Sequence, residues 1–526
     1  MPTDNEISNG RAAKQSSSAF LGFDAGNLAP WILVALIIYA AIRSTFQAAT
    51  RPFWYDEVCT WVIVRQHGVS AMWSALSHGV DGQPLGYYLV ERFAAVFTRN
   101  EEISFRLPSI VGFACLLMCV YAFARKRSGN LNAVVCAAIP FFTVLFDPFA
   151  VEARPYSLVI ACLAFAVVCY QNAPSTSWMI LMGLSLALAQ TFHYYCVVSF
   201  FPFIAAETVW TLLNRRLRIW VWLAFCIGLL PLIIFWPVLS RFRAYYGAHF
   251  WAVPSLAGAE ASYGWYFNSS TALGIDLAAV TALAVLIKLL YLIRKNKQSA
   301  PQASELFSQP ILILGFLALP FVGFVFSQIA HGGMTPRYTL AALLAFPLAM
   351  AYVFPPVKHA SFGIAAVIAI LLAFALQEKG FWSSHSSHFV SPTDSVQELV
   401  ASAGYPDLLV VISHPHDFLQ LAHYAPPEWN KRFVCLLDPA EAVVYSGSDS
   451  ADKELQVMRE FIPLQAYDFQ EFAALHNSFL LYSSNAGQGL DWWGAKLFRS
   501  GYALKMVAQK DYYHRVFLVT KKGDSP

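Results

Sequence analysis

Charged residues are scarce in this 526-residue chain, and their scarcity excludes an ordinary soluble fold. Asp, Glu, Lys and Arg together make up 13% of the sequence, whereas soluble domains carry about 25%. Hydrophobic residues make up 57% and the mean hydropathy is +0.50, so we expect most of the chain to lie in lipid. The net charge is only +3, and no dense basic tract with interleaved aromatic residues occurs. We therefore expect no nucleic-acid partner.

Paired cysteine spacings and an N-terminal signal sequence are also lacking. The nine cysteines fall mostly in apolar runs, where a thiol behaves as a small hydrophobic group. They indicate neither a disulfide framework nor a zinc site. Residues 1–27 are polar and rich in serine, without the apolar core of a signal peptide. We interpret them as a disordered cytoplasmic tail, so that the first membrane span acts as the entry signal.

Long apolar runs are abundant and predict about 11 transmembrane helices, since a helix needs about 20 mostly apolar residues to cross a bilayer. Such runs begin near Leu28, Ser104, Leu131, Tyr156, Trp178, Cys196, Ile219, Thr271, Gln309, Tyr338 and Ser361. Short loops rich in Lys and Arg favour the cytoplasm. They lie at 125–127, 215–218, 294–297 and around Lys358, and they agree with one topology, with the N-terminus inside and the C-terminus outside.

One apolar segment, Pro84 to Thr98, is too short to be a span. It has about 15 residues with Glu91 and Arg92 in its middle, which is typical of an interfacial or re-entrant helix. If it crossed the bilayer, the basic cluster at 125–127 would lie outside. We therefore expect residues 50–103 to form one large outer loop with interfacial helices.

The composition changes near Gln377, where charges and histidines increase and long apolar runs stop. Short apolar runs at 408–412, 433–437, 479–482 and 515–519 resemble strands, with helical stretches at 417–423 and 490–498 between them. The predicted fold class is an all-α polytopic membrane protein with a small C-terminal soluble α/β domain. Its parts are a cytoplasmic tail at 1–27, a transmembrane domain at 28–376 and an extracytoplasmic domain at 377–526.

Charged residues gather in the predicted outer loops. They are Asp56, Glu57, Asp147, Glu152, Arg154, Arg241, Arg243 and Arg337. A carboxylate can accept the proton of an attacking hydroxyl, and guanidinium groups can bind a phosphate and the charge it gains on leaving. The set therefore fits glycosyl transfer from a lipid phosphate, although each charge could also be a solvated loop residue or an interfacial anchor.

Four motifs carry a resemblance to a known superfamily. They are Arg51–Glu57 (RPFWYDE), Gly82–Tyr88 (GQPLGYY), Phe105–Ser109 (FRLPS) and Glu152–Ser157 (EARPYS). In this order they resemble the outer-loop motifs of the C-type glycosyltransferases that use polyprenyl-phosphate sugars, the superfamily of protein O-mannosyltransferases and lipid A aminoarabinose transferases. The likeness covers about residues 28–350, strongly in the first 160. Gln83 and Gly86 depart from the usual pattern, and they are positions at which the sugar or acceptor preference can differ from that of the characterised branches.

The resemblance implies a role for each site residue. Asp56 would be the catalytic base, and Glu57 its neighbour that positions the acceptor, binds a metal or tunes the pKa of Asp56. The resemblance also implies a substrate-binding set: Glu152, Arg154, Tyr156, Arg337, Tyr338 and Tyr87. Within it the two arginines would bind the carrier phosphate, and Glu152 and Tyr156 would shape the sugar pocket.

A divalent metal is possible, but no ligand is assigned. The histidines of the predicted outer face are His78, His193, His249 and His331. They could complete a site with Glu57 or Glu152, but no two of them share ligand spacing. The run His414-Pro415-His416-Asp417 could also bind metal, and a strand-to-helix turn capped by Asp417 explains it equally well.

The leading hypothesis is an inverting membrane glycosyltransferase with a polyprenyl-phosphate sugar donor and a glycan, lipid or protein acceptor. It would act on the periplasmic face of a bacterial inner membrane, where the C-terminal domain also lies. The alternative is a transporter or flippase of lipid-linked sugars, which should carry ionisable residues near mid-membrane. Few such residues lie inside the predicted spans, chiefly Glu207 and Lys288, both near cytoplasmic ends. A third hypothesis places the activity in the outer domain, but that domain contains no nucleophile elbow or phosphate loop.

Overall fold

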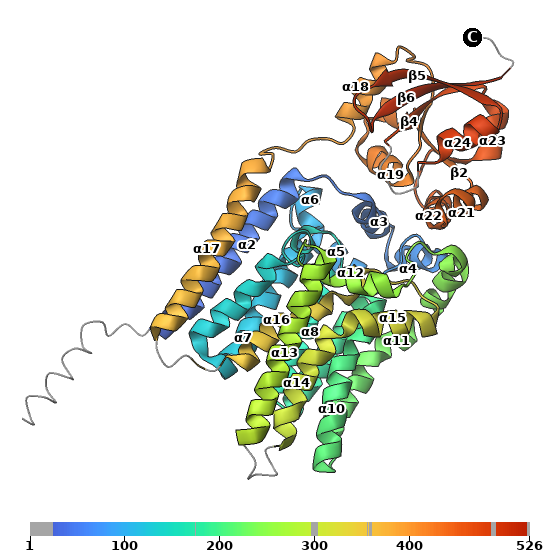
Figure 1. The fold of residues 1–526 in the computed structure, drawn as a ribbon. Helices are drawn as coiled ribbons and strands as arrows, with labels where there is room; N and C mark the ends of the chain where they lie inside the picture. The colour runs from blue at the N-terminus through green and yellow to red at the C-terminus, as the bar shows by residue number, and fades with distance from the viewer. Residues whose placement is uncertain are drawn as a thin grey trace, which may run out of the picture.

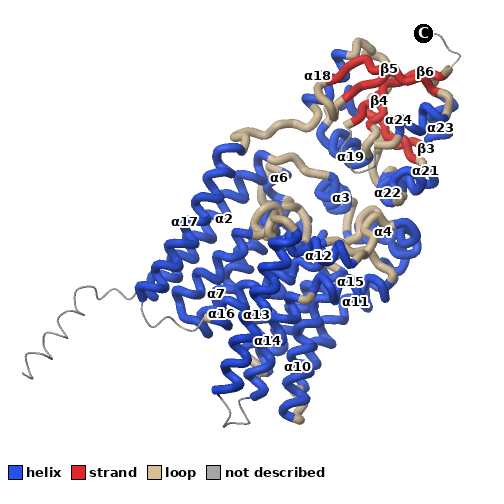
Figure 2. The backbone as a smooth tube through the Cα atoms, in the orientation of Figure 1, coloured by secondary structure: helices blue, strands red, loops and turns tan. Residues whose placement is uncertain are grey.

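The protein consists of a bundle of long helices with a sheet-containing domain at one end (Figure 1). The computed structural model describes residues 25–173, 175–295, 303–354, 356, 360–484 and 491–522. Most of the predicted tail at 1–27 and the basic residues Lys297 and Lys358 lie outside the described residues. Among the described residues, the bundle contains helices and the loops between them, and strands occur only in the C-terminal domain (Figure 2).

The bundle is built mainly from α2 (Ala29–Thr50), α7 (Leu107–Ala138), α8 (Tyr156–Gln171), α9 (Thr176–Phe192), α10 (Phe201–Asn214), α11 (Ile219–Tyr246), α12 (Leu256–Tyr266), α13 (Thr271–Lys295), α14 (Ala303–Leu317), α15 (Leu319–Ala330), α16 (Ala345–Val353) and α17 (Ala360–Ser384). Short 3-10 segments join them at Ala25–Leu28, Ile139–Phe142, Phe149–Val151, Tyr194–Phe200, Gly247–His249 and Pro336–Leu344.

Among the described residues, seven helices are long and apolar enough to cross a membrane, or up to eight if the bent pair α14 and α15 is one span. The helices α8 and α9 are apolar but shorter. The predicted count of 11 is not confirmed by this criterion.

The long helix α7 contains two of the predicted spans, because the chain reverses within it. Gly129 has φ 80° and ψ 173°, a conformation that favours glycine. The rings of Phe113 and Phe141 lie 5.3 Å apart, whereas a straight helix would separate residues 28 positions apart by about 42 Å. The segment is therefore a hairpin of two antiparallel arms, with its turn at Gly129.

Four short helices follow the first span: α3 (Tyr55–Val64), α4 (Val69–His78), α5 (Leu85–Ala94) and α6 (Glu101–Ser104). Each has 10 residues or fewer, too few to span a bilayer. Helix α5 lies where the sequence predicts an interfacial helix. A Cβ added to its Gly86 would lie 2.7 Å from the Thr191 Cβ at the end of α9. The close packing of α5 on α9 explains the glycine at this position.

The C-terminal domain contains a six-stranded sheet of order β3-β2-β1-β4-β6-β5. The strands are β1 (Val410–Ile412), β2 (Phe433–Leu437), β3 (Ala466–Asp468), β4 (Ser478–Ser483), β5 (Tyr502–Gln509) and β6 (Arg515–Lys521). Strands β1 to β4 pair in parallel, and β6 is antiparallel to β4 and β5. The sequence predicts four of these strands but not the edge strands β3 and β5. Helices flank the sheet: α18 (Asp394–Ser402), α19 (Pro415–Tyr424), α20 (Pro427–Asn430), α21 (Pro439–Ser446), α22 (Ser450–Met458), α23 (Phe469–Leu475) and α24 (Trp493–Arg499).

The last bundle helix, α17, extends past residue 377 and ends at Ser384. Just beyond the predicted domain boundary, Glu378 is buried and pairs at 3.3 Å with Arg43 of α2. Arg43 also pairs at 3.0 Å with Asp147. Asp147, one of the charges of the predicted outer loops, is thus part of the contact between helices.

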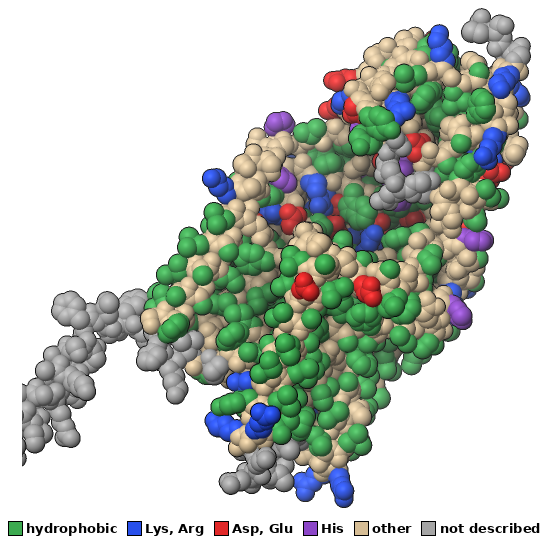
Figure 3. Space-filling model, viewed as in Figure 1, with side chains coloured by type: hydrophobic (Ala, Val, Ile, Leu, Met, Phe, Trp, Pro, Cys, Tyr) green, Lys and Arg blue, Asp and Glu red, His purple; other side chains and the backbone are tan. Residues whose placement is uncertain are grey.

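Hydrogen bonds hold the C-terminal domain against the bundle, and two examples come from different helices of the domain. Gln420 of α19 donates to the Phe53 carbonyl at 2.6 Å, just before α3. The Lys453 ammonium of α22 donates to the Tyr245 carbonyl at 2.9 Å, at the end of α11. Figure 3 shows acidic and basic side chains gathered in the hollow between bundle and domain, and Lys and Arg side chains at the far end of the bundle.

Candidate active site

A fully buried ion pair fixes the start of α3. The Glu57 carboxylate receives hydrogen bonds from Arg106 Nε at 2.7 Å and Nη2 at 2.6 Å. It also accepts from the backbone N–H groups of Trp54 at 3.1 Å and Ala153 at 2.8 Å. Both Glu57 and Arg106 are 0% exposed. Burial alone would raise the pKa of Glu57, but the charges of Arg106 and Arg51 lower it below its usual value.

The next carboxylate, Asp56, points to the other side of α3 and is 20% exposed. Its Oδ2 lies 2.6 Å from Arg337 Nη1 and 3.8 Å from Arg154 Nε. Burial acts to raise the pKa of Asp56, but the two guanidinium groups hold it below its ordinary value. The carboxylate is therefore ionised at neutral pH, beside two cations from distant parts of the chain.

A second carboxylate, Asp81, holds Arg154 in place. Arg154 Nη1 donates to Asp81 Oδ2 at 2.6 Å and to the Asp56 carbonyl at 3.2 Å. Asp81 is 8% exposed and lies in the turn before α5. It is not among the site residues predicted from the sequence, although it directly precedes the Gly82–Tyr88 motif. Its position directly before a recognised motif is the feature of the sequence that could have identified it as a site residue.

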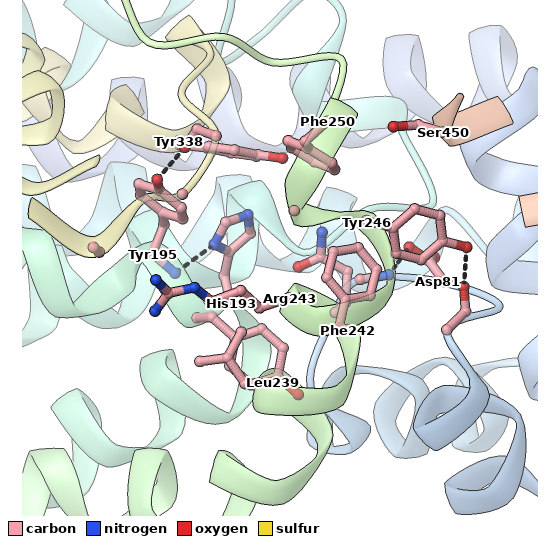
Figure 4. A pocket seen from close by; sticks show the side chains of 18 of the residues that line it. Asp81, His193, Tyr195, Leu239, Phe242, Arg243, Tyr246, Phe250, Tyr338 and Ser450 are labelled. Atoms are coloured by element: carbon pink, nitrogen blue, oxygen red, sulfur yellow. Dashed lines mark hydrogen bonds between the residues drawn. The ribbon is translucent and has the colours of Figure 1, made fainter. Parts of the chain in front are cut away.

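A cavity of about 610 Å³ lies between the bundle and the C-terminal domain, and its wall includes four of these charged residues: Asp56, Asp81, Arg154 and Arg337. Aromatic side chains form another part of the wall, and the rings of Tyr195 and Tyr338 are stacked with centroids 4.6 Å apart. Helix α11 and the segment after it contribute Leu239, Phe242, Arg243, Tyr246 and Phe250 (Figure 4). The cavity thus joins a charged region to a wide apolar and aromatic wall, as an amphiphilic ligand requires.

Five of the predicted site residues line this cavity: Asp56, Arg154, Tyr156, Arg337 and Tyr338. The other three, Glu57, Glu152 and Tyr87, are not among its lining residues. Tyr87 is 0% exposed and its ring packs against Tyr88 at 5.2 Å. Glu152 is 7% exposed, and burial raises its pKa to about 7.

The C-terminal domain contributes two residues to the same cavity, Ser450 and Glu454 of α22. The Cys59 thiol of α3 lies 3.1 Å from Glu454 Oε1. Burial, followed by the charge of Asp81, raises the pKa of Glu454 to about 8. No sequence signal distinguishes Glu454 from other surface acids, because only the packing of α22 on the bundle brings it near Asp56.

The candidate metal ligands of the sequence are dispersed. Of the four outer histidines, His193 and His331 line the cavity, whereas His78 and His249 do not. The ring of His416 packs on Tyr55 at 4.1 Å, at the contact between α19 and α3. Among the described residues, no group of three or more His, Cys, Asp or Glu side chains could hold a metal ion.

Comparison with known proteins agrees with this architecture. The sequence model of the dolichyl-phosphate-mannose-protein mannosyltransferase family matches residues 79–240. No curated protein sequence matches the chain. The crystal structure of ArnT from Cupriavidus metallidurans in the apo state is similar, with a TM-score of 0.53 at 12% identity. The same enzyme bound to undecaprenyl phosphate gives 0.51 at 13%.

Each alignment covers 92% of this chain and 97% of the ArnT chain, so the likeness of fold includes both the bundle and the C-terminal domain. At this low identity it establishes the fold, while the family match establishes a likeness of sequence over a range that contains the second, third and fourth motifs. Together they confirm the resemblance of this chain to the superfamily of C-type integral-membrane glycosyltransferases.

Proposed function

We propose that the protein transfers a sugar from a polyprenyl-phosphate carrier to an acceptor, with Asp56 as the general base. The observation that carries the proposal is the pairing of the ionised Asp56 with two arginines, Arg154 and Arg337, in the wall of a largely apolar cavity. One anionic base and two phosphate-binding cations are the groups that this reaction needs.

The cavity suits a donor with a charged head and an apolar tail. Guanidinium groups bind phosphate oxygens well, because their planar donors match the spacing of the oxygens. The apolar and aromatic side chains of α11 would contact the first isoprene units. The related ArnT structure, crystallised with undecaprenyl phosphate, supports a carrier of this class.

Binding of the donor would also activate the base. The Arg337 guanidinium lies 2.6 Å from Asp56 and makes this carboxylate a weak base. A phosphate that draws Arg337 toward itself would weaken this interaction and raise the pKa of Asp56. The base would then be strongest when the donor is in place.

The reaction follows as a single displacement. Asp56 takes the proton of an acceptor hydroxyl, whose oxygen attacks the anomeric carbon from the side opposite the phosphate. The bond between the anomeric carbon and the phosphate oxygen breaks, and the carrier leaves as a phosphate whose new charge Arg154 and Arg337 stabilise. One displacement inverts the anomeric configuration. Glu454, protonated at neutral pH, would donate a hydrogen bond to the sugar or the acceptor.

The three residues outside the cavity wall would act indirectly. Glu57 would position Asp56 through Arg106 rather than contact the acceptor, and Tyr87 and Glu152 would support the wall. The charged end of the cavity lies beside the C-terminal domain. We propose that both face the periplasm of a bacterial inner membrane, since the arginines that follow α10 (Arg215 and Arg216) and the basic end of α13 lie at the opposite end of the bundle (Figure 1).

The test is transfer of radiolabelled sugar from a panel of polyprenyl-phosphate sugars in membranes that contain Asp56→Asn. The matched control is Asp276→Asn, which removes an exposed carboxylate from α13. We expect the control to match wild type. The transfer rate of Asp56→Asn should be about 10²–10⁴-fold lower than that of wild type. Asp56→Asn should still bind undecaprenyl phosphate, because the two arginines lose a competing carboxylate.

Two results would contradict the proposal. Wild-type turnover by Asp56→Asn would exclude this residue as the base. Label that crosses the bilayer on an unchanged carrier, equally in wild type and variant, would instead identify a flippase of lipid-linked sugars.

A further inference from the structure

A second cavity, of about 620 Å³, lies near the end of the bundle away from the C-terminal domain. Residues of α7, α8, α10, α13, α14 and α16 contribute to its wall. Four of its lining residues are basic, Lys126, Arg127, Arg218 and Lys288, and none of the described lining residues is acidic. A cavity of this size can hold a lipid headgroup or a small ligand.

One of the four cations is neutralised within the protein. Arg218 Nε donates to Glu207 at 2.9 Å, and Glu207 is 0% exposed. The Arg218 guanidinium also lies 4.0 Å from the ring centre of Trp210. This pair explains the intramembrane Glu207. Of the other three cations, the Arg127 guanidinium lies 5.4 Å from the Phe123 ring centre, and the lysines Lys126 and Lys288 remain to be explained.

Neither lysine forms an ion pair with a described acidic residue. Lys126 donates to the Asn172 side chain at 2.8 Å, and the Lys288 ammonium lies 6.0 Å from the Tyr291 ring centre. Lys288 is seven residues before Lys295, the last residue of α13, which places it about 10 Å inside the helix end. A cation at this depth is costly without a negative partner, so it calls for a functional explanation.

Uncharged polar groups are present in the same wall. Gln309 and Tyr352 both line the cavity. The Tyr352 hydroxyl is buried and makes no hydrogen bond within the described residues. A hydroxyl can donate to an anionic oxygen. Next to the cavity, α13 exposes Ile287, Leu290 and Tyr291, a surface that an acyl or isoprenoid chain can cover.

We propose that this second cavity binds the phosphate headgroup of an anionic membrane lipid. The two lysines, a buried hydroxyl and an amide would contact the phosphate oxygens, and the lipid chain would lie along α13. Basic cavities between transmembrane helices at the cytoplasmic end are suited to such headgroups. The site shares no residue with the cavity around Asp56 and does not depend on the proposed transfer reaction.

The test measures lipid retention by the full-length protein with native mass spectrometry. The probes are dioleoyl phosphatidylglycerol, undecaprenyl phosphate, inorganic phosphate and, as the neutral reference, dioleoyl phosphatidylcholine. Lys288→Ala should weaken binding of the anionic lipid about fivefold and the double variant Lys126→Ala/Lys288→Ala about 25-fold, from the usual contribution of one basic side chain to anionic-lipid binding. Lys288→Arg should restore most of the binding.

The matched control is Arg125→Ala. Arg125 belongs to the same basic loop and is exposed, but it does not line the cavity. Wild-type retention by this control supports binding inside the cavity rather than to the basic loop in general. Tighter binding of phosphatidylglycerol or of undecaprenyl phosphate identifies the source of the headgroup. An equal loss in Arg125→Ala, or unchanged retention in the double variant, would overturn the proposal. Because retention of phosphatidylglycerol needs no sugar transfer, this outcome does not depend on whether the protein is a transferase.

Discussion

Replacing Glu57 by Gln should unfold the active-site end of the bundle rather than only slow the reaction. The substitution keeps the shape of the side chain but removes a buried charge that Arg106 contacts at 2.6 and 2.7 Å. Both side chains are 0% exposed, so water cannot solvate the Arg106 charge that remains. Breaking such a buried pair on one side costs about 3–5 kcal/mol.

The side-chain amide introduced by Glu57→Gln would make the loss worse in one respect. Its oxygen can still accept from Arg106 or from the Ala153 N–H, but its NH₂ group would face a donor where a carboxylate oxygen now accepts. Because these bonds join α3, the start of α7 and the loop before α8, their loss should loosen all three segments together.

The assay heats the detergent-solubilised protein to a series of temperatures. Size-exclusion chromatography then measures the fraction that remains folded at each temperature. The control is Glu398→Gln, which removes an exposed carboxylate of α18 and should stay within about 0.5 kcal/mol of wild type. The double variant Glu57→Gln/Arg106→Gln should recover part of the loss, because the fully buried charge of Arg106 is removed together with its partner. Wild-type stability of Glu57→Gln would refute the reasoning.

Three further predictions concern the cavity and its wall. Arg337→Lys keeps the charge but loses the planar fork, so the KM for the polyprenyl-phosphate sugar should rise about tenfold in a transfer assay; an unchanged KM would exclude Arg337 from phosphate binding. Burial raises the pKa of Glu454 to about 8, so its carboxyl is protonated at pH 7 and loses the proton as the pH rises through about 8. Transfer should therefore decline above pH 8, and Glu454→Gln, which cannot ionise, should extend the active range upward; identical pH profiles would contradict a role for this proton. Gly86→Ala would place a Cβ 2.8 Å from the Thr191 carbonyl oxygen and should destabilise the protein by about 1–3 kcal/mol, whereas Gly380→Ala, with no atom within 4 Å, should not lower its melting temperature.

Much of the architecture could be predicted from the sequence, because bilayer thickness and the charge of short loops constrain a helical membrane protein strongly. The apolar runs predicted both arms of α7, which the length criterion alone merges into one helix. The sequence did not predict the edge strands β3 and β5. Strand β3 has only three residues, and β5 alternates weakly because much of it is exposed. Short or exposed strands carry little periodic signal.

The sequence by itself determined that the chain lies in a membrane, that its charges gather in particular loops, and that its motifs resemble one superfamily. The resemblance gave the neighbours Asp56 and Glu57 different roles, but the residues themselves show no reason for the difference, because adjacent carboxylates look alike until their surroundings are known. Only the tertiary structure buried Glu57 against Arg106 and turned Asp56 toward Arg337, a residue 281 positions away. Only the packing of α22 on the bundle brought Glu454 into the cavity. The physical reason is that the role of an ionisable group depends on its burial and on the charges near it, and both depend on long-range packing that no local pattern records.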